Sequence, residues 1–152
     1  MEMRIVRLGA LHVAAARAVS AEPEADAFRI LVDWAQPRGL LDREGYRVFG
    51  FNNPNPTPSS PVYGYEVWMT VGSEVHPDGP VQIKEFAGGL YAVARIRPRS
   101  GDDISRGWQE LHRRVMRAGR CHGSHQWLEE HIGPLGAPLE ECEMDLYYPL
   151  AE

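Results

Sequence analysis

The segment 127–131 places an indole, two carboxylates and an imidazole within five residues. Its sequence, Trp127-Leu128-Glu129-Glu130-His131, alternates like a short strand and lies between a Gly-Ser pair and a Gly-Pro pair. On a strand, Trp127, Glu129 and His131 point to one face while the aliphatic residues point to the other. A carboxylate shielded from water by aromatic rings favours a positively charged partner. We therefore expect Glu129 to be the counter-charge for a cationic ligand, with Trp127 and His131 beside it.

Five more aromatic or acidic residues are candidates for the same ligand site. Trp68 and Tyr147 take equivalent places in two predicted strands, where cation–π contacts of about 0.5–2 kcal/mol each would hold a flat cation. Tyr91 follows a Gly-Gly pair, where it either lines the site or packs in the core. Glu66 and Asp145 are either a solvated rim or a second pair of charge partners. For the aromatic residues, core packing is the alternative.

Metal and cofactor chemistry have weaker support in the sequence. The run Cys121-His122-Gly123-Ser124-His125, with His112 upstream, matches no familiar zinc spacing, so a loop between a helix and a strand is the favoured interpretation. The chain has no nucleophile elbow, phosphate-binding glycine loop or dinucleotide fingerprint; the pair Gly88-Gly89 is predicted to be a turn or bulge. The sequence therefore predicts neither a metal nor a cofactor.

The composition indicates one ordinary globular domain. The chain has 152 residues, of which 43% are hydrophobic and 24% charged, and a formal net charge of −5. An acidic chain without a basic stripe argues against nucleic-acid binding, which rests largely on phosphate neutralisation. No apolar run approaches the roughly 20 residues that cross a membrane. Two cysteines and no recognisable signal peptide predict a cytoplasmic protein with reduced thiols.

Hydrophobic spacing predicts two helices and a set of strands that position these residues. Apolar residues recur at helical spacing in 21–38 and 103–117. Strands are predicted at 47–51, 63–71, 81–86, 90–96, 126–131 and 143–150. The segment 4–19 begins as a strand and continues into an alanine-rich run whose propensity also allows a helix. The prolines in 54–61 predict an extended loop.

The two halves of the chain repeat each other at an offset of about 79–80 residues. The aligned pairs include Trp108 with Phe28, Leu111 with Leu31, Leu128 with Phe49, Leu146 with Val67, and Glu129 with Gly50. The expected fold is therefore α+β, a single domain 1–152 in which pseudo-repeats 1–75 and 80–152 each run strand, helix, strand, strand. We expect an antiparallel sheet with helices on one face. The open face would form a ligand cleft, carrying Glu66, Trp68, Asp145, Tyr147, Trp127 and Glu129, with Gly50 leaving room opposite Glu129.

Several segments together carry a family resemblance. They are Phe49-Gly50-Phe51-Asn52-Asn53-Pro54, Val62-Tyr63-Gly64-Tyr65-Glu66-Val67, Phe86-Ala87-Gly88-Gly89-Leu90-Tyr91-Ala92-Val93, Trp108-Gln109-Glu110-Leu111, Trp127-Leu128-Glu129 and Asp145-Leu146-Tyr147-Tyr148-Pro149-Leu150. In this order the chain resembles the GyrI-like small-molecule-binding family, also found as the effector-binding domain of AraC-type and MerR-type multidrug regulators. The resemblance implies a duplicated βαββ fold, a cleft between the halves and a buried carboxylate that attracts lipophilic cations. Glu129 matches that carboxylate, whereas His131 stands where the family commonly has tyrosine.

Three functions follow from these observations. The first is a stand-alone cytoplasmic binder of lipophilic aromatic, often cationic, small molecules. The second, implied by resemblance to stand-alone hydrolases, is an enzyme that opens strained cyclopropane rings, in which Glu129 would activate water with help from His131 or a pocket tyrosine. The third is a protein-interaction module, such as a gyrase-binding inhibitor, for which the proline-rich loop 54–61 would be available.

Overall fold

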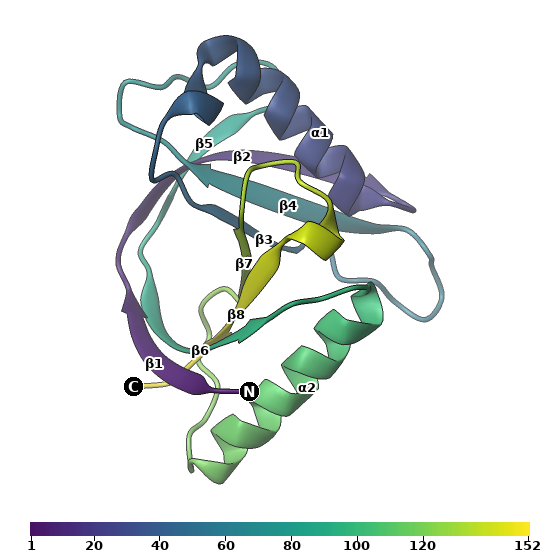
Figure 1. Ribbon diagram of the computed structural model, residues 1–152, viewed down its shortest axis with the longest axis vertical. Coiled ribbons are helices and arrows are strands. Elements are labelled where there is room, and N and C mark those ends of the chain that lie inside the picture. The colour runs from purple at the N-terminus through teal and green to yellow at the C-terminus, as the bar shows by residue number, and fades with distance from the viewer. The chain divides into compact units, whose positions relative to one another are not determined.

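The structure is a computed structural model that describes residues 1–152. The chain forms two compact units. The first unit consists of Leu11–Phe86 with Pro134–Gly136, and the second unit consists of Met1–Ala10, Ala87–Gly133 and Ala137–Glu152. Each unit contains an antiparallel four-stranded sheet and one α-helix (Figure 1).

In the first unit the strands lie in the order β3-β4-β2-β5. The elements are β2 (Leu11–Ser20), α1 (Pro23–Ala35), β3 (Val48–Asn52), β4 (Tyr63–Thr70) and β5 (Gln82–Phe86). Two short 3-10 helices, η1 (Gln36–Arg38) and η2 (Leu40–Asp42), follow α1. The alanine-rich run is a strand, because its central residues Ala14 and Ala16 pair in register with Met69 and Val67 of β4.

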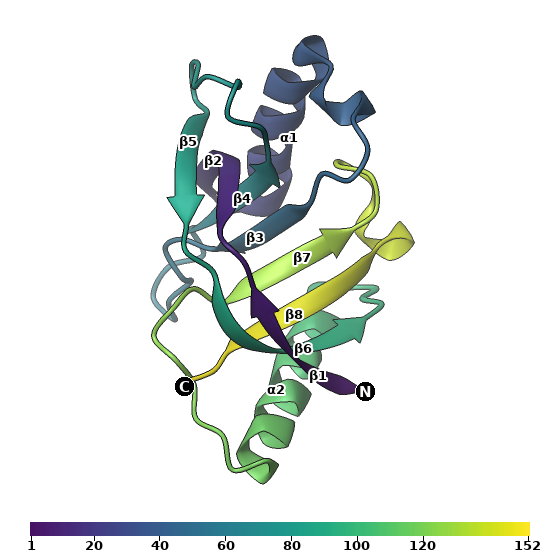
Figure 2. The same cartoon turned by 90° about the vertical axis from the view of Figure 1, so that its left-hand side faces the viewer.

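In the second unit the order is β1-β6-β8-β7, as the view in Figure 2 makes clear. The elements are β1 (Met3–Leu8), β6 (Gly89–Ile96), α2 (Gly101–Arg117), β7 (Leu128–Ile132), η3 (Leu139–Glu141) and β8 (Glu143–Pro149). Neither helix of the chain combines the length and the apolar character needed to span a bilayer.

The helix of each unit covers one face of that unit's own sheet. Against α1 lie Ala14, Ala16 and Val67, with Leu31 of the helix wholly buried between them. The small alanine side chains let the helix backbone approach β2 closely. α1 begins at Pro23, which is preorganised for a first helical turn, and Gly39, with φ of 70°, ends the 3-10 turn after it.

The helix α2 packs on its sheet through a small residue at the point of closest approach. A β-carbon at Gly107 would come within 3.0 Å of Leu146 Cδ1, so glycine lets α2 sit directly on β8. Leu111 and Val115 continue the same buried stripe. Asp102 and Asp103 lie in the first turn of α2 and Arg114 and Arg117 in its last, each sign favoured by the helix dipole at its end.

The predicted α+β fold with duplicated strand, helix, strand, strand order is confirmed. The pairing registers show the same offset, because Gly50 lies opposite Val67 and Glu129 lies opposite Leu146. The division of the chain differs from the predicted half-and-half repeat. β1 precedes the first unit in sequence but pairs with β6 of the second unit, so the second unit includes residues from both ends of the chain.

The proline-rich segment 54–61 forms the predicted loop. Its residues are exposed except for the half-buried Ser60, and the loop turns back on itself between Thr57 and Ser60. It begins at a cis peptide bond between Asn53 and Pro54.

Candidate functional site

The face on which Glu129 lies is set by the pairing of β7 with β8. Directly opposite residues of an antiparallel pair share a face. Glu129 is opposite Leu146 and His131 is opposite Met144, whereas Leu128 is opposite Tyr147 and Glu130 is opposite Asp145. Leu146 and Met144 belong to the core cluster that packs against α2. Glu129 and His131 therefore lie on the helix side of the sheet.

The prediction that Glu129 and Trp127 share an open face with Tyr147 and Asp145 is wrong. The alternation within β7 was assigned correctly, but the register between β7 and β8 puts these residues on opposite faces of the second unit. The acidic residue of β7 on the side of Tyr147 is Glu130, which is buried and accepts a hydrogen bond of 2.7 Å from the Tyr147 hydroxyl.

On the helix side, Glu129 lies against aromatic rings. The indole Nε1 of Trp108, on α2, donates a hydrogen bond of 3.1 Å to Glu129 Oε2. The Trp127 ring meets the Trp108 ring edge-to-face at 5.6 Å and the Tyr148 ring at 4.5 Å. Trp127 is 39% exposed, so the aromatic cluster is open to solvent on that side. We call Glu129, Trp108, Trp127 and Tyr148 the Glu129 cluster.

Two imidazoles border the Glu129 cluster. His112, on α2, makes a 2.8 Å hydrogen bond through Nδ1 with the Tyr148 hydroxyl. His122 lies with its ring 6.3 Å from the Trp127 ring. Burial, followed by the nearby Cys121 thiol, raises the pKa of Tyr148 above its ordinary value, so this hydroxyl is protonated at neutral pH. The edge of the cluster thus carries two imidazoles and a neutral tyrosine hydroxyl, and Tyr148 adds no negative charge to that of Glu129.

His131 occupies the same face as Glu129, two residues further along β7. Burial lowers its pKa to about 4, and the neighbouring Glu130 carboxylate opposes that shift without cancelling it. The imidazole is therefore neutral at pH 7. A neutral ring can orient a ligand or a water molecule, but it adds no positive charge that would repel a cation.

Gly50, the residue of the first unit that corresponds to Glu129 in the repeat, does not border an open space. A β-carbon at Gly50 would overlap the hydroxyl and ring of Tyr65, on the adjacent strand β4. The absence of a side chain at Gly50 therefore accommodates Tyr65. The expectation that Gly50 leaves room for a ligand is wrong, because a buried tyrosine takes that space.

The predicted acids Glu66 and Asp145 are buried and held by cations of their own units. Glu66 accepts hydrogen bonds from Trp68 Nε1 at 2.7 Å, from Lys84 Nζ at 2.8 Å and from Asn53 Nδ2 at 3.1 Å. Neither acid forms a solvated rim, since each is 2% exposed. The Glu66 carboxylate thus has charge and hydrogen-bond partners within the first unit.

Asp145 is bound in the same manner in the second unit. Arg95 donates to its carboxylate through Nε at 2.8 Å and Nη2 at 3.1 Å, and Arg4 Nη2 donates at 2.9 Å. Burial acts to raise the pKa of Asp145, but the hydrogen bonds and charges of Arg95 and Arg4 outweigh it and hold the pKa below its ordinary value. The carboxylate stays ionised within this network.

The remaining predicted aromatics are also core residues. Trp68 is 6% exposed and packs edge-to-face against Phe51 at 5.0 Å. Tyr91 is fully buried, packs against Tyr147 at 5.3 Å, and donates its hydroxyl to the Gln126 carbonyl at 2.5 Å. Burial raises the pKa of Tyr91 well above its ordinary value. These contacts favour the core-packing alternative for the three residues.

Sequence reasoning missed Trp108 and Tyr148. Helical spacing within 103–117 alone favours core packing for Trp108, but an indole carries a donor that a buried site must satisfy. Its repeat equivalent, Phe28, has no such donor, and that difference parallels the change from Gly50 to Glu129. This pairing of substitutions across the repeat was the available signal.

The cysteine and histidine side chains of the segment 121–125 contact different parts of the second unit. Cys121 and Cys142 are both free thiols. His125 hydrogen-bonds to the Leu90 carbonyl at 2.8 Å and packs edge-to-face on Tyr91. No group of three or more histidine, cysteine, aspartate or glutamate side chains is arranged to hold a metal ion.

The sequence pattern of the GyrI-like small molecule binding domain matches residues 1–150, so the chain belongs to this family. It is a small-molecule-binding domain of the class that the fold and the resemblance indicate. No curated protein sequence matches the chain.

Solved structures with low sequence identity share the fold. The EcmrR C-terminal domain is 10% identical with a TM-score of 0.73, and the alignment covers 99% of this chain and 98% of that one. SAV2435 bound to tetraphenylphosphonium is 11% identical with a TM-score of 0.56, covering 99% and 94%. A hydrolase from Listeria innocua is 9% identical with a TM-score of 0.69, covering 99% and 92%. In the EcmrR–DNA complex, the chain spans 57% of the EcmrR chain.

Proposed function

We propose that this protein binds lipophilic aromatic cations at the Glu129 cluster, with Glu129 as the counter-charge. The observation that carries the proposal is a half-buried carboxylate held by an indole N–H within a cluster of aromatic rings. A cation placed there would gain charge attraction from Glu129 and cation–π contacts from the rings. The partly exposed Trp127 offers a ring face to a ligand arriving from solvent.

The family and one neighbour support this choice of ligand. GyrI-like domains bind small molecules, and the structurally similar SAV2435 has been solved with tetraphenylphosphonium, which is itself a lipophilic aromatic cation. A cytoplasmic setting is part of the proposal, because a protein with two unpaired thiols suits a reducing compartment.

Titration with a fluorescent aromatic cation such as rhodamine 6G tests the proposal. Fluorescence anisotropy should show saturable binding in the micromolar range. Glu129→Gln should weaken binding about 10- to 100-fold, because it removes a partly desolvated charge worth about 1.4–3 kcal/mol. Trp127→Ala should weaken it about 2- to 30-fold, the equivalent of a cation–π contact of about 0.5–2 kcal/mol.

The matched control is Glu140→Gln, which removes the same charge at an exposed position in η3. Its affinity should equal that of the wild type within a factor of two. Equal affinities for the Glu129 and Glu140 variants would rule out Glu129 as the counter-charge.

A second function is favoured by the pairing of Glu129 with a neutral imidazole on the same face. In a hydrolase that opens a strained cyclopropane, Glu129 would accept a proton from water while the water oxygen attacks the ring carbon. The carbon–carbon bond would break, and its electron pair would pass to a conjugated carbonyl of the substrate. His131, neutral because its pKa is lowered to about 4, would orient the water.

Incubation with a cyclopropane-bearing alkylator separates catalysis from sequestration. Mass spectrometry should detect a ring-opened product that has gained one water molecule, formed over many equivalents and lost in Glu129→Gln. Consumption that stops at one equivalent would leave binding as the function of the cluster.

A further inference from the structure

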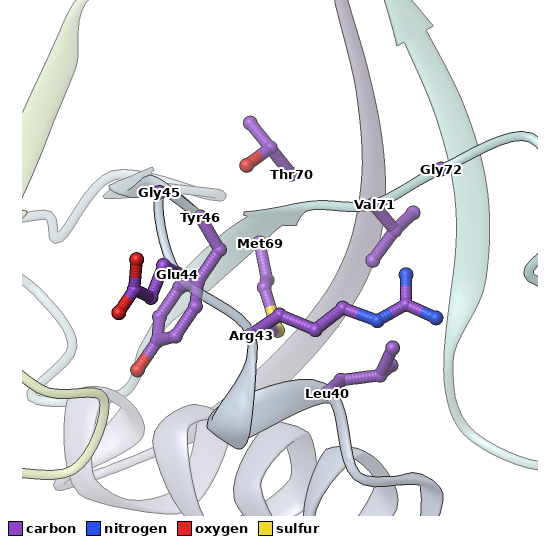
Figure 3. A pocket seen from close by; sticks show the side chains of 9 residues that line it. All are labelled: Leu40, Arg43, Glu44, Gly45, Tyr46, Met69, Thr70, Val71 and Gly72. Atoms are coloured by element: carbon purple, nitrogen blue, oxygen red, sulfur yellow. The ribbon is translucent and has the colours of Figure 1, made fainter.

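A hollow of about 210 Å³ lies in the first unit and shares no lining residue with the Glu129 cluster (Figure 3). Its lining comes from two stretches of chain: η2 with the turn that follows it, and the end of β4 with the two residues after it. The lining residues are Leu40, Arg43, Glu44, Gly45, Tyr46, Met69, Thr70, Val71 and Gly72. The volume is below the roughly 300–1,000 Å³ of sites for drug-sized ligands, so the hollow suits a molecule with a single ring.

The floor of the hollow is apolar. Met69 and Leu40 are almost wholly buried side chains of the first-unit core, and the Tyr46 ring and Val71 form parts of the wall. A methionine sulfur makes favourable contacts with aromatic rings, and its flexible side chain adapts to the shape of the ring. An aromatic body therefore fits this floor better than a polar one.

The rim of the hollow carries an excess of negative charge. The Arg43 guanidinium binds Glu74 at 2.7 Å, and this hydrogen bond holds the pKa of Glu74 below its ordinary value. The positive charge of Arg43 is thus already matched. Glu44 adds a second carboxylate at the rim, and Figure 3 shows it beside the Tyr46 ring. A cationic group on the ligand would meet Glu44, whereas an anionic group would be repelled.

We propose that this hollow is a second binding site, for a small arylalkylammonium ion whose ring rests on Met69, Leu40 and Tyr46 and whose charge faces Glu44. The site is distinct from the Glu129 cluster and does not depend on the function proposed for it. Tyr46 also gives the site a reporter, because its hydroxyl oxygen accepts the Leu135 backbone N–H at 3.3 Å. A ring packed on Tyr46 changes the environment of that amide.

The test is an NMR titration of the full chain with 2-phenylethylammonium. Backbone amide signals of 40–46, 69–72 and Leu135 should move together and saturate with a dissociation constant of about 0.1–3 mM, as expected for nine non-hydrogen atoms. 3-Phenylpropionate, the matched anionic probe, should bind at least threefold more weakly. The affinity for the ammonium ion should fall as salt is added.

Three variants locate the site. Glu44→Gln should weaken ammonium binding about threefold or more, Glu140→Gln should leave it unchanged, and Val71→Phe should abolish it by filling the hollow. Glu44 is exposed, so its variant keeps the test valid if Val71→Phe unfolds. The proposal is overturned if these signals do not saturate, if the anion binds as tightly, or if Glu129→Gln abolishes binding that Glu44→Gln leaves intact.

Discussion

Replacement of Asp145 by asparagine should destabilise the protein strongly, although the change alters only a few atoms. The carboxylate is 2% exposed and accepts three hydrogen bonds, two from Arg95 and one from Arg4. Asparagine removes the charge and turns an NH2 group toward one of these donors. Removing one partner of a buried ion pair costs about 3–5 kcal/mol.

The expected loss is somewhat smaller here, about 2–3 kcal/mol, because the side chains of Arg4 and Arg95 are 48% and 46% exposed and regain hydration. For a chain of this size, that corresponds to a fall in Tm of about 4–12 °C. Urea unfolding followed by far-UV circular dichroism measures the loss. The control is Glu143→Gln, because the Glu143 carboxylate lies 3.7 Å from Arg95 Nε in a more exposed ion pair. This variant should lower the free energy of unfolding by about 0.5 kcal/mol or less.

The same network fixes the pH dependence of this loss. The pKa of Asp145 lies below the ordinary value of 3.8, so its contribution is complete above that value and disappears as the pH falls through the folded-state pKa. The stability difference between the wild type and Asp145→Asn should therefore be constant from about pH 5 to 8 and shrink below about pH 4. A difference that persists unchanged at pH 2, or a loss no larger than that of Glu143→Gln, would refute the role assigned to the charge.

Two further predictions concern single positions. Gly50→Ala should lower the free energy of unfolding by about 1–3 kcal/mol, because the new methyl group overlaps Tyr65. The control is Gly9→Ala, whose methyl group meets no atom within 4 Å and should change stability little. Chemical denaturation of the two variants tests this difference. The pKa of His131 is lowered from 6.5 to about 4 in the folded protein, so the unfolded chain takes up this proton at a higher pH than the folded chain does. The free energy of unfolding should therefore fall by up to about 3 kcal/mol as the pH is lowered from 6.5 to about 4. An imidazole NMR titration of His131 with its midpoint above pH 6 would contradict the burial argument.

The elements and the repeat could be predicted because they depend on local patterns. Helical spacing indicated α1 and α2, and the offset of about 79–80 residues correctly paired Gly50 with Glu129. The face of Glu129 could not be predicted, because it depends on the register between β7 and β8. The ten-residue connection from Gly133 to Cys142 sets that register, and its turn at η3 has no simple hairpin signature.

The surroundings of the candidate residues were harder to predict than their existence. Glu66 and Asp145 were recognised as an equivalent pair, and both are buried. One cation of each acid, however, comes from a strand that lies two places away in the sheet: Lys84 on β5 for Glu66, and Arg4 on β1 for Asp145. Neither cation is close in sequence to its acid, so no short-range pattern could show that these charges were already compensated.

The pairing of β1 with β6 has a consequence for how the chain folds during synthesis. The continuous part of the first unit, Leu11–Phe86, is available before β6 has been made, whereas Met3–Leu8 must remain without its sheet partner until Gly89–Ile96 emerges. The edge strand β1 of the second unit is thus synthesised first but can join its sheet only after β6 has been synthesised. Because this contact joins residues that are far apart in sequence, its formation slows folding. A cut near residue 80 would leave the C-terminal fragment without its edge strand, and adding residues 1–10 as a separate peptide should restore it.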